Sequence, residues 1–322
     1  MSSRVLLVDT DSLIPNLALM KISAYHKSIG DQVGFDVNDP DKVYASVIFK
    51  HNKHKVDGLK FYYPNAEIDI GGSGYDLKKC LPAEIDRMQP DYDLYPKCDY
   101  YLGFTSRGCI RHCPFCIVPI KEGNYKTVCH VSEICHGENF TKCVLMDNNI
   151  LADKDHFLET AYWLIDNNIS VDFNQGLDAR LFDQEVVDVL ASLRAFRTWR
   201  IAFDSMDYKE DVLRAILMME AAGISLKHDV MCYVYCDSDD DVEDAVNRCR
   251  ILKENGVTAY AMLNIDTPIT PRMQRLKNWT IPQCFWSCDY DEVDEKTRNK
   301  IRNKKSKTCM YKPTSESLEV AL

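Results

Sequence analysis

Residues 107–119 contain three closely spaced cysteines, Cys109, Cys113 and Cys116. Their spacing, C-x3-C-x2-C, brings three thiolates together on one short loop. Such a loop can hold three irons of a cubic iron–sulfur cluster and leave the fourth iron open to another ligand. A ferredoxin that only transfers electrons would supply a fourth cysteine, but the next one, Cys129, follows 13 residues later. The spacing therefore predicts a cluster with one open iron.

Zinc is the alternative metal, because His112 or His130 could complete a site with three cysteines and one histidine. Structural zinc sites usually pair two knuckles that lie apart in the sequence, whereas these cysteines form one compact loop. A chance grouping is the third interpretation in a chain with 14 cysteines. The loop directly follows a predicted strand, where the active-site loops of β/α barrels lie, and this position favours a functional cluster.

The loop resembles the signature of the radical S-adenosylmethionine (SAM) superfamily, C-x3-C-x-Φ-C, with Phe115 as the aromatic residue. The resemblance covers residues 98–288 and implies that Cys109, Cys113 and Cys116 ligate a [4Fe–4S] cluster. The open iron would bind the amino and carboxylate groups of SAM. An electron donor such as flavodoxin or ferredoxin would reduce the cluster, which then cleaves SAM. The resulting 5′-deoxyadenosyl radical would abstract hydrogen from an unidentified substrate.

The resemblance also implies where SAM is held. In the family a Gly-Gly-Glu motif after the second strand holds the SAM amino group, and this chain has Asp147, Asn148 and Asn149 there. These side chains can accept the same hydrogen bonds, although a strand-ending turn is the alternative for the asparagines. Polar residues after the third strand would meet the ribose or the carboxylate, while Arg180 could instead form an ion pair with the next helix. The predicted cofactor-binding residues are Phe115, Asp147, Asn148, Asn149, Asn174, Gln175, Asp178 and Arg180.

Polar residues also follow the later strands. Asp204 comes after the fourth strand and could orient the substrate or cap the next helix. The fifth strand, residues 231–237, lacks the glycines of the Gly-x-Ile-x-Gly motif that contacts adenine in the family. The sixth strand is followed by Asn264 and Asp266. These positions predict a polar rim at one end of the strands.

An alternation of short apolar strands and amphipathic helices would position these residues. We expect strands at residues 100–105, 143–146, 171–173, 200–203, 230–235 and 259–263. We expect helices at residues 154–167, 184–195, 208–222 and 239–255. Six strands with crossover helices predict parallel pairing and a partial (β/α)6 TIM-like barrel over residues 98–288.

A linker with two prolines, residues 88–98, precedes this region. Before it, strands at 5–8, 44–49 and 67–70 and a helix at 15–29 predict a small doubly wound βαβ domain over residues 1–90. Its place resembles that of the cobalamin-binding-like domains of the superfamily. The Asp-x-His-x-x-Gly motif that ligates cobalt is missing after the first strand, so we expect no cobalamin. Cys80 and Cys98 do not reproduce the three N-terminal cluster ligands of methylthiotransferases. We therefore predict that this domain serves in substrate or partner recognition.

The remaining cysteines lack the close spacing of the loop. A second cluster is an alternative for three of them, Cys129, Cys135 and Cys143, and for the pairs Cys232 with Cys236 and Cys284 with Cys288. Free cysteine is commonly a small buried apolar residue. We therefore expect packing roles outside positions 109, 113 and 116.

The composition is that of a globular chain, with 46% hydrophobic and 27% charged residues. Lysine and arginine number 39 against 49 acidic residues, and the net charge of −10 argues against general binding to nucleic acids or anionic membranes. The sequence shows neither a signal peptide nor an apolar run of roughly 20 residues. We therefore expect a cytoplasmic protein without a membrane partner, whose cysteines stay reduced.

Two segments carry many basic residues, residues 50–60 and the charged C-terminal extension over residues 289–322. We expect both to be solvated, and a contact with an anionic partner is the alternative. Two other functions remain open beside hydrogen abstraction. One is radical methyl or methylthio transfer to a nucleic acid or protein, and the other is a non-catalytic zinc- or iron–sulfur-binding interaction module.

Overall fold

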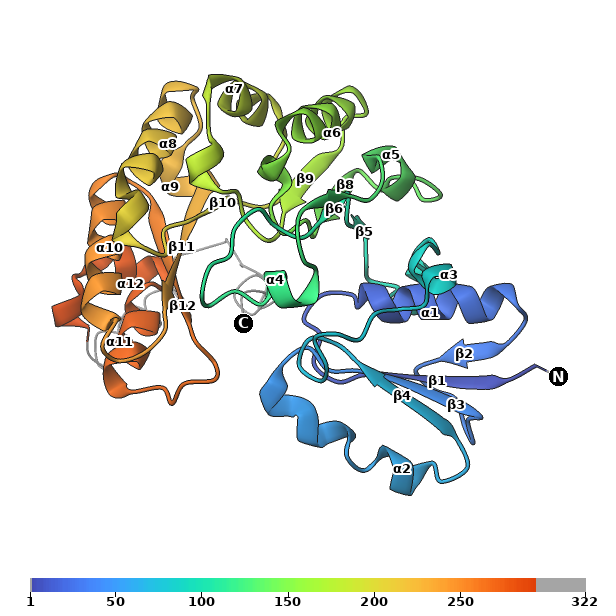
Figure 1. Ribbon diagram of the computed structural model, residues 1–322. Helices are drawn as coiled ribbons and strands as arrows, with labels where there is room; N and C mark the ends of the chain where they lie inside the picture. The colour runs from blue at the N-terminus through green and yellow to red at the C-terminus, as the bar shows by residue number, and fades with distance from the viewer. Residues whose placement is uncertain (1, 294–322) are drawn as a thin grey trace, which may run out of the picture.

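The computed structural model of the chain describes residues 2–293. The elements of its N-terminal part are β1 (Arg4–Asp9), α1 (Leu17–Ser28), β2 (Gln32–Gly34), β3 (Lys42–Ser46), α2 (Leu59–Tyr62), β4 (Glu67–Gly71) and α3 (Ala83–Asp86). The four strands form one parallel sheet in the order β2-β1-β3-β4. Helices α1 and α2 lie on opposite faces of this sheet (Figure 1).

Local hydrogen bonds explain where these elements begin and end. Helix α1 begins after Asn16, whose side-chain oxygen accepts a hydrogen bond from the backbone N–H of Leu19 at 3.2 Å. The predicted strand at 44–49 ends earlier, because the Asp11 carboxylate accepts the backbone N–H groups of Ile48 and Phe49. Strand β2 was not predicted, since it has three residues and no apolar alternation and is held by backbone pairing with β1.

The described residues after the linker, here called the second part of the chain, form eight further strands. They are β5 (Tyr101–Gly103), β6 (Ser106–Arg107), β7 (Lys126–Thr127), β8 (Lys142–Leu145), β9 (Ser170–Phe173), β10 (Trp199–Ala202), β11 (Val230–Cys236) and β12 (Thr258–Leu263). The helices are α4 (Val118–Lys121), α5 (Val131–Ile134), α6 (Lys154–Asp166), α7 (Gln184–Ser192), α8 (Lys209–Ala221), α9 (Leu226–Asp229), α10 (Val242–Glu254), α11 (Pro271–Trp279) and α12 (Pro282–Ser287). All six predicted strands and all four predicted helices are present within a few residues.

Six of these strands form two separate parallel sheets, in the orders β5-β8-β9 and β10-β11-β12. The sheets adjoin where the backbone N–H of Leu177 donates to the carbonyl of Arg200 at 2.7 Å. An ion pair between Asp172 on β9 and Arg200 on β10 also joins them, and both residues are buried. Arg197 contacts the other Asp172 oxygen at 3.2 Å. The prediction of a mixed α/β chain with parallel strands is confirmed.

Helices α6, α7, α8 and α10 cover the outer side of the curved row of strands (Figure 1). The large core lies between these helices and the strands. In β11 the alternate residues Val230, Cys232, Val234 and Cys236 face this core and are buried, which leaves Tyr233 and Tyr235 on the inner side of the row. At β11 the inner side therefore carries aromatic side chains.

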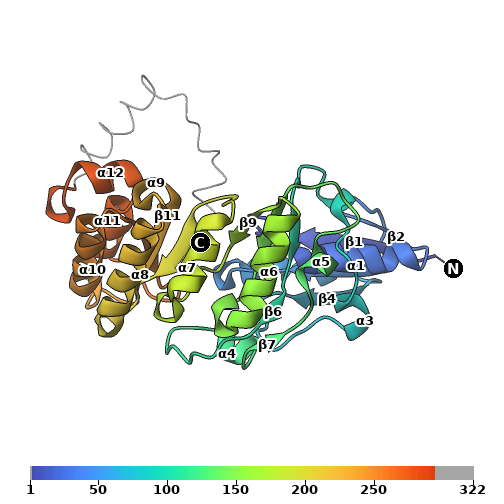
Figure 2. The same ribbon diagram turned by 90° about the horizontal axis from the view of Figure 1, so that it is seen from above.

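Figure 2 shows the N-terminal sheet and the second part side by side. Hydrogen bonds join them, including that from the Tyr95 hydroxyl to Asp9 at 2.6 Å. Within residues 2–293 no helix is both long enough and apolar enough to cross a membrane. Most of the charged extension, including its basic run at 300–307, lies outside the described residues.

Candidate functional site

The three cysteines of the predicted cluster lie on the loop that joins β6 to α4, residues 108–117, here called the Cys loop. The loop begins at Gly108, whose φ is +79° and where a Cβ atom would lie 2.2 Å from the Asn124 carbonyl oxygen. Only glycine fits this close approach. The Gly108 N–H donates to the side-chain oxygen of Asn148 at 2.9 Å. The residues after β8 therefore anchor the start of the Cys loop.

Nitrogen donors surround the thiols of the loop. The backbone N–H of Arg111 points to the Cys109 sulfur at 3.3 Å, and that of Val118 points to the Cys116 sulfur at 3.5 Å. Burial raises the pKa of Cys113 and of Cys116, and the neighbouring loop thiols add to the effect. Within residues 2–293, no three cysteine, histidine or acidic side chains already hold metal-ligand positions. The loop thus gathers the thiols into one environment without arranging them as a finished metal site.

Two of the three residues predicted after β8, Asn148 and Asn149, contact the start of the Cys loop. Asn149 is 4% exposed, and its amide nitrogen lies 3.4 Å from the Cys109 sulfur. Its side-chain oxygen is buried and has no hydrogen-bond partner in the described part of the chain. Asn148 binds Gly108, as described above. An unpartnered buried acceptor costs free energy unless a donor meets it, so the Asn149 oxygen marks a place for a donor group.

Asp147 is buried and its carboxylate already has several partners. It accepts hydrogen bonds from the backbone N–H and the hydroxyl of both Thr105 and Ser106. His156 extends this network through the Thr105 hydroxyl at 2.9 Å. Burial raises the pKa of Asp147, although these hydrogen bonds oppose the rise. In this geometry Asp147 holds the chain between β5 and β6, directly before the Cys loop.

Asp178 and Arg180, predicted after β9, meet at the same place. The Asp178 carboxylate accepts hydrogen bonds from Arg180 at 2.6 Å and from Arg111 of the Cys loop at 3.0 Å. Burial favours the neutral acid, but these hydrogen bonds outweigh it and lower the pKa of Asp178. Arg180 lies over the Tyr208 ring at 4.6 Å and lowers the pKa of the Cys113 thiol, against the effect of burial. Arginine groups thus approach the Cys loop from two elements.

Phe115 lies at the rim and is 39% exposed. Its ring stacks on that of Tyr235, with centroids 4.3 Å apart, and the Tyr235 hydroxyl donates to Asp237 at 2.7 Å. The stack covers one face of Phe115. Arg111 and Tyr235 were not among the predicted site residues. Arg111 occupies an unspecified position of the cysteine motif, and the alternation along β11 was the signal that could have placed Tyr235 on the inner side.

Asp204 lies behind the rim and links three elements. Its carboxylate accepts the backbone N–H of Tyr235 at 2.9 Å, and its own N–H donates to the Tyr208 hydroxyl at 3.1 Å. Ser205, and not Asp204, caps the short helical turn that follows. Burial raises the pKa of Asp204 to about 6, since the Tyr235 hydrogen bond and the Arg248 charge oppose it only partly.

We expect Asp204→Asn to change how stability depends on pH. The folded chain holds the Asp204 proton more tightly than the unfolded chain. Its contribution to stability is therefore fully present below pH 3.8 and is lost as the pH rises through about 6. The free energy of unfolding is measured by urea denaturation from pH 4 to 7. Between these pH values, the difference between the variant and the wild type should shift in favour of the variant by up to about 3 kcal/mol. The exposed Asp240→Asn serves as the control, and a constant difference between Asp204→Asn and the wild type across this range would contradict the prediction.

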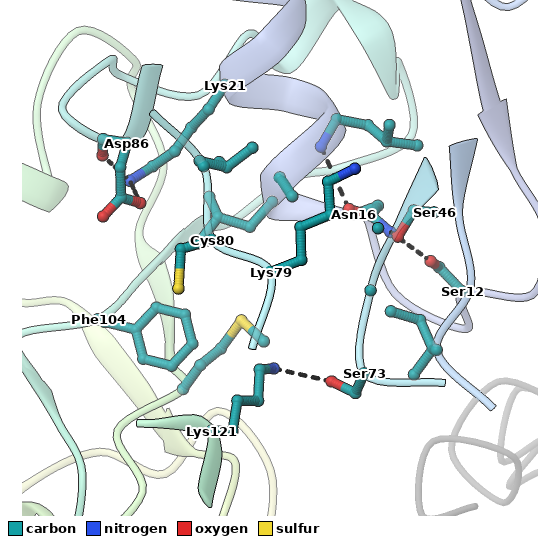
Figure 3. A pocket seen from close by; sticks show the side chains of 18 of the residues that line it. Ser12, Asn16, Lys21, Ser46, Ser73, Lys79, Cys80, Asp86, Phe104 and Lys121 are labelled. Carbon is teal, nitrogen blue, oxygen red and sulfur yellow. Dashed lines mark hydrogen bonds and ion pairs between the residues drawn. The ribbon is translucent and has the colours of Figure 1, made fainter. Parts of the chain in front are cut away.

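Asn174 and Gln175 are not brought to the Cys loop by any hydrogen bond of the structure. Instead they line a cavity of about 760 Å³ between the N-terminal sheet and the second part of the chain. The segment after the Cys loop reaches this cavity through Lys121, which donates to the Ser73 hydroxyl at 2.8 Å (Figure 3). The cavity thus lies between the N-terminal sheet and the segment that follows the Cys loop.

The structure also places the histidines of the zinc alternative and the cysteines considered for a second cluster. His130 caps α5, where its ring accepts the backbone N–H of Ser132 at 3.2 Å. His112 is exposed on the Cys loop. Every described cysteine is a free thiol, and most of those outside the loop are buried in the core. The thiols of Cys135 and Cys143 interact with each other there.

No protein-family model matches this chain, and no curated protein sequence matches it.

Proposed function

We propose that this chain is a radical SAM enzyme that abstracts hydrogen from its substrate. A [4Fe–4S] cluster with SAM on its open iron would supply the 5′-deoxyadenosyl radical for this reaction. Cys109, Cys113 and Cys116 are the proposed cluster ligands. The donor set fits this group, since soft thiolates are the preferred ligands of iron–sulfur clusters and N–H groups directed at sulfur tune such clusters. His130 is already used as a helix cap, which favours iron and sulfide over a zinc site that needs this histidine.

The unpartnered oxygen of Asn149 is the observation that supports this proposal most. It is buried directly beside Cys109, and the same side chain donates to the Cys109 sulfur. The SAM amino group is a donor of the right kind for that oxygen. We therefore assign Asn149 to the amino group, and Asp147 to holding the strand ends that support the Cys loop.

The other rim residues would orient the rest of SAM. Tyr235 covers one face of Phe115, and the other face would pack against adenine. Asp178 holds the guanidinium groups of Arg180 and Arg111 near the loop, where they can pair with the SAM carboxylate. In this proposal the two adjoining parallel sheets act as a partial (β/α)6 barrel, with the Cys loop after its first strand.

Asn149→Ala should weaken SAM binding while the cluster still assembles. The variant removes the oxygen assigned to the amino group but leaves all three cysteines in place. Loss of one hydrogen bond, worth up to about 1.5 kcal/mol, predicts weakening of up to about tenfold. The measurement is SAM affinity of the reconstituted protein by equilibrium dialysis, together with its iron and sulfide content. Asn167→Ala, which alters an exposed helix end, is the matched control. Unchanged affinity in Asn149→Ala would remove the assignment.

The proposed function is tested by anaerobic reconstitution with iron and sulfide, reduction with dithionite and addition of SAM. We expect a brown protein that releases 5′-deoxyadenosine and methionine, detected by chromatography. A colourless protein that binds zinc and forms no 5′-deoxyadenosine would favour the non-catalytic interaction module instead. A flavodoxin or ferredoxin would replace dithionite in the cell. The free thiols suit a reducing compartment, and we propose the cytoplasm.

A further inference from the structure

The cavity between the two parts of the chain lies where two sets of strands end. Residues after β1, β3 and β4 line it from the N-terminal sheet, and Phe104, Met146 and Asn174 line it after β5, β8 and β9. The sheet order β2-β1-β3-β4 places β2 and β3 on opposite sides of β1, and open parallel sheets bind ligands beyond their carboxyl ends at such a point. A volume of about 760 Å³ suits a small molecule.

The wall on the side of the N-terminal sheet offers hydrogen-bond donors. The amide nitrogen of Asn16 donates to the hydroxyl oxygens of Ser12 and Ser46, each at 2.8 Å. Since each hydroxyl oxygen accepts from Asn16, its proton remains available to a ligand. Ser46 lines the cavity and is only 5% exposed, so its hydroxyl has little contact with bulk water. The third serine of this wall, Ser73, accepts from Lys121 in the same way.

The charges of the cavity favour an anion. Its lining contains five cationic side chains and four acidic ones, a balance of +1 in a chain whose net charge is −10. Lys79 pairs with Asp69. Lys121 donates to the neutral Ser73 hydroxyl, and its contact with Glu122 is longer, at 3.8 Å. Glu122 compensates the Lys121 charge only at this longer distance, so the ammonium can also meet an anionic group beside Ser73.

The opposite wall carries large apolar side chains beside its charged and polar residues. Figure 3 shows the Phe104 ring across the cavity from Ser12, Asn16 and Ser46. Met146 and Met262 line the same region from the strands of the second part. A ligand that fits both walls has an acceptor-rich anionic end and an apolar body.

We propose that this cavity binds the substrate, a small molecule with a phosphate or carboxylate end that Ser12, Ser46 and Lys121 recognise. Its apolar body lies against Phe104, Met146 and Met262, toward the strand ends that carry the candidate site. The role of this ligand as the substrate rests on the proposed function, but its binding to the cavity needs neither the cluster nor SAM. In this proposal the N-terminal sheet recognises the substrate through the polar side chains at the carboxyl ends of its strands.

Three probes with one apolar body and different ends test the proposal: n-hexyl phosphate, n-hexanoate and 1-hexanol. Each is titrated calorimetrically into the full-length protein at low and high NaCl. We expect both anions to bind more tightly than the alcohol and their affinity to fall with salt. In Lys121→Met the anions should bind about tenfold more weakly, with 1-hexanol unchanged. Lys97→Met, an exposed lysine outside the cavity, is the matched control, and thermal melting checks that both variants fold.

The relative affinity of the two anions identifies the end group, phosphate or carboxylate. Equal binding of all three probes, binding of none, or equal losses in Lys121→Met and Lys97→Met would each overturn the inference. SAM cleavage is measured separately on the reconstituted protein. Probe selectivity without SAM cleavage leaves the anion site and removes the proposed function, while SAM cleavage without selectivity does the reverse.

Discussion

Cys113→Ala is expected to abolish both the brown chromophore after reconstitution and the release of 5′-deoxyadenosine from SAM. Two thiolates cannot replace three on a cubic cluster with one open iron, so the effect should be a complete loss and not a partial one. Cys113 is only partly buried, and alanine leaves no buried charge, so the chain should fold normally. Iron, sulfide and 5′-deoxyadenosine are measured together under anaerobic conditions.

Cys98→Ser is the matched control for this experiment. Cys98 is also a partly buried free thiol, but it lies in the linker before β5, away from the Cys loop. Its variant should retain cluster content and SAM cleavage. If Cys113→Ala kept both properties, Cys113 would not be a ligand, and the proposed loop would have to be abandoned.

The second large effect concerns the ion pair between the two parallel sheets. Asp172→Ala leaves the buried Arg200 guanidinium without its carboxylate, and the free energy of unfolding should fall by about 3–5 kcal/mol. Arg197 loses a partner as well, but its side chain is partly exposed and can reach water. Urea denaturation of the apoprotein, followed by circular dichroism, measures the change.

The double variant Asp172→Leu with Arg200→Met separates the cost of an unpaired charge from the value of the pair. Replacing both ions with apolar side chains of similar size is often neutral, so we expect most of the lost stability to return. A double variant as unstable as Asp172→Ala would mean that the pair itself holds β9 to β10. An Asp172→Ala protein as stable as the wild type would show that water reaches Arg200.

Local patterns were sufficient to predict the six strands of the two parallel sheets and four helices of the second part, but they missed the short strands β6 and β7 and the helices α4, α5, α9, α11 and α12. Each of the six predicted strands is a short, mainly apolar run, and caps such as Asp153 and Asp183 begin helices α6 and α7. Strand β2 escaped prediction because backbone pairing with β1 creates it, and no side-chain pattern reports that pairing. The division into two sheets escaped it too, since it depends on how β9 and β10 meet through Asp172 and Arg200.

The sequence alone was enough to single out Cys109, Cys113 and Cys116 as a candidate site, because their spacing and the aromatic residue between them lie within eight residues. It also placed Asn148, Asn149, Asp178 and Arg180 after the strands that bring them to the Cys loop. Only the tertiary structure showed which of the polar side chains after the strands already have hydrogen-bond partners. Asp147 is bound to Thr105 and Ser106, whereas the Asn149 oxygen is unpartnered, and a hydrogen-bond partner from a distant segment cannot be read from local sequence.

The cavity was decided by tertiary structure alone. Ser12, Ser46, Ser73 and Lys121 come from four segments that are distant in the sequence. They line one space because parallel strands end at the same edge of a sheet and the two parts of the chain face each other across that edge. Local sequence therefore singled out the Cys loop, and the packing of distant segments determined which residues lie beside it.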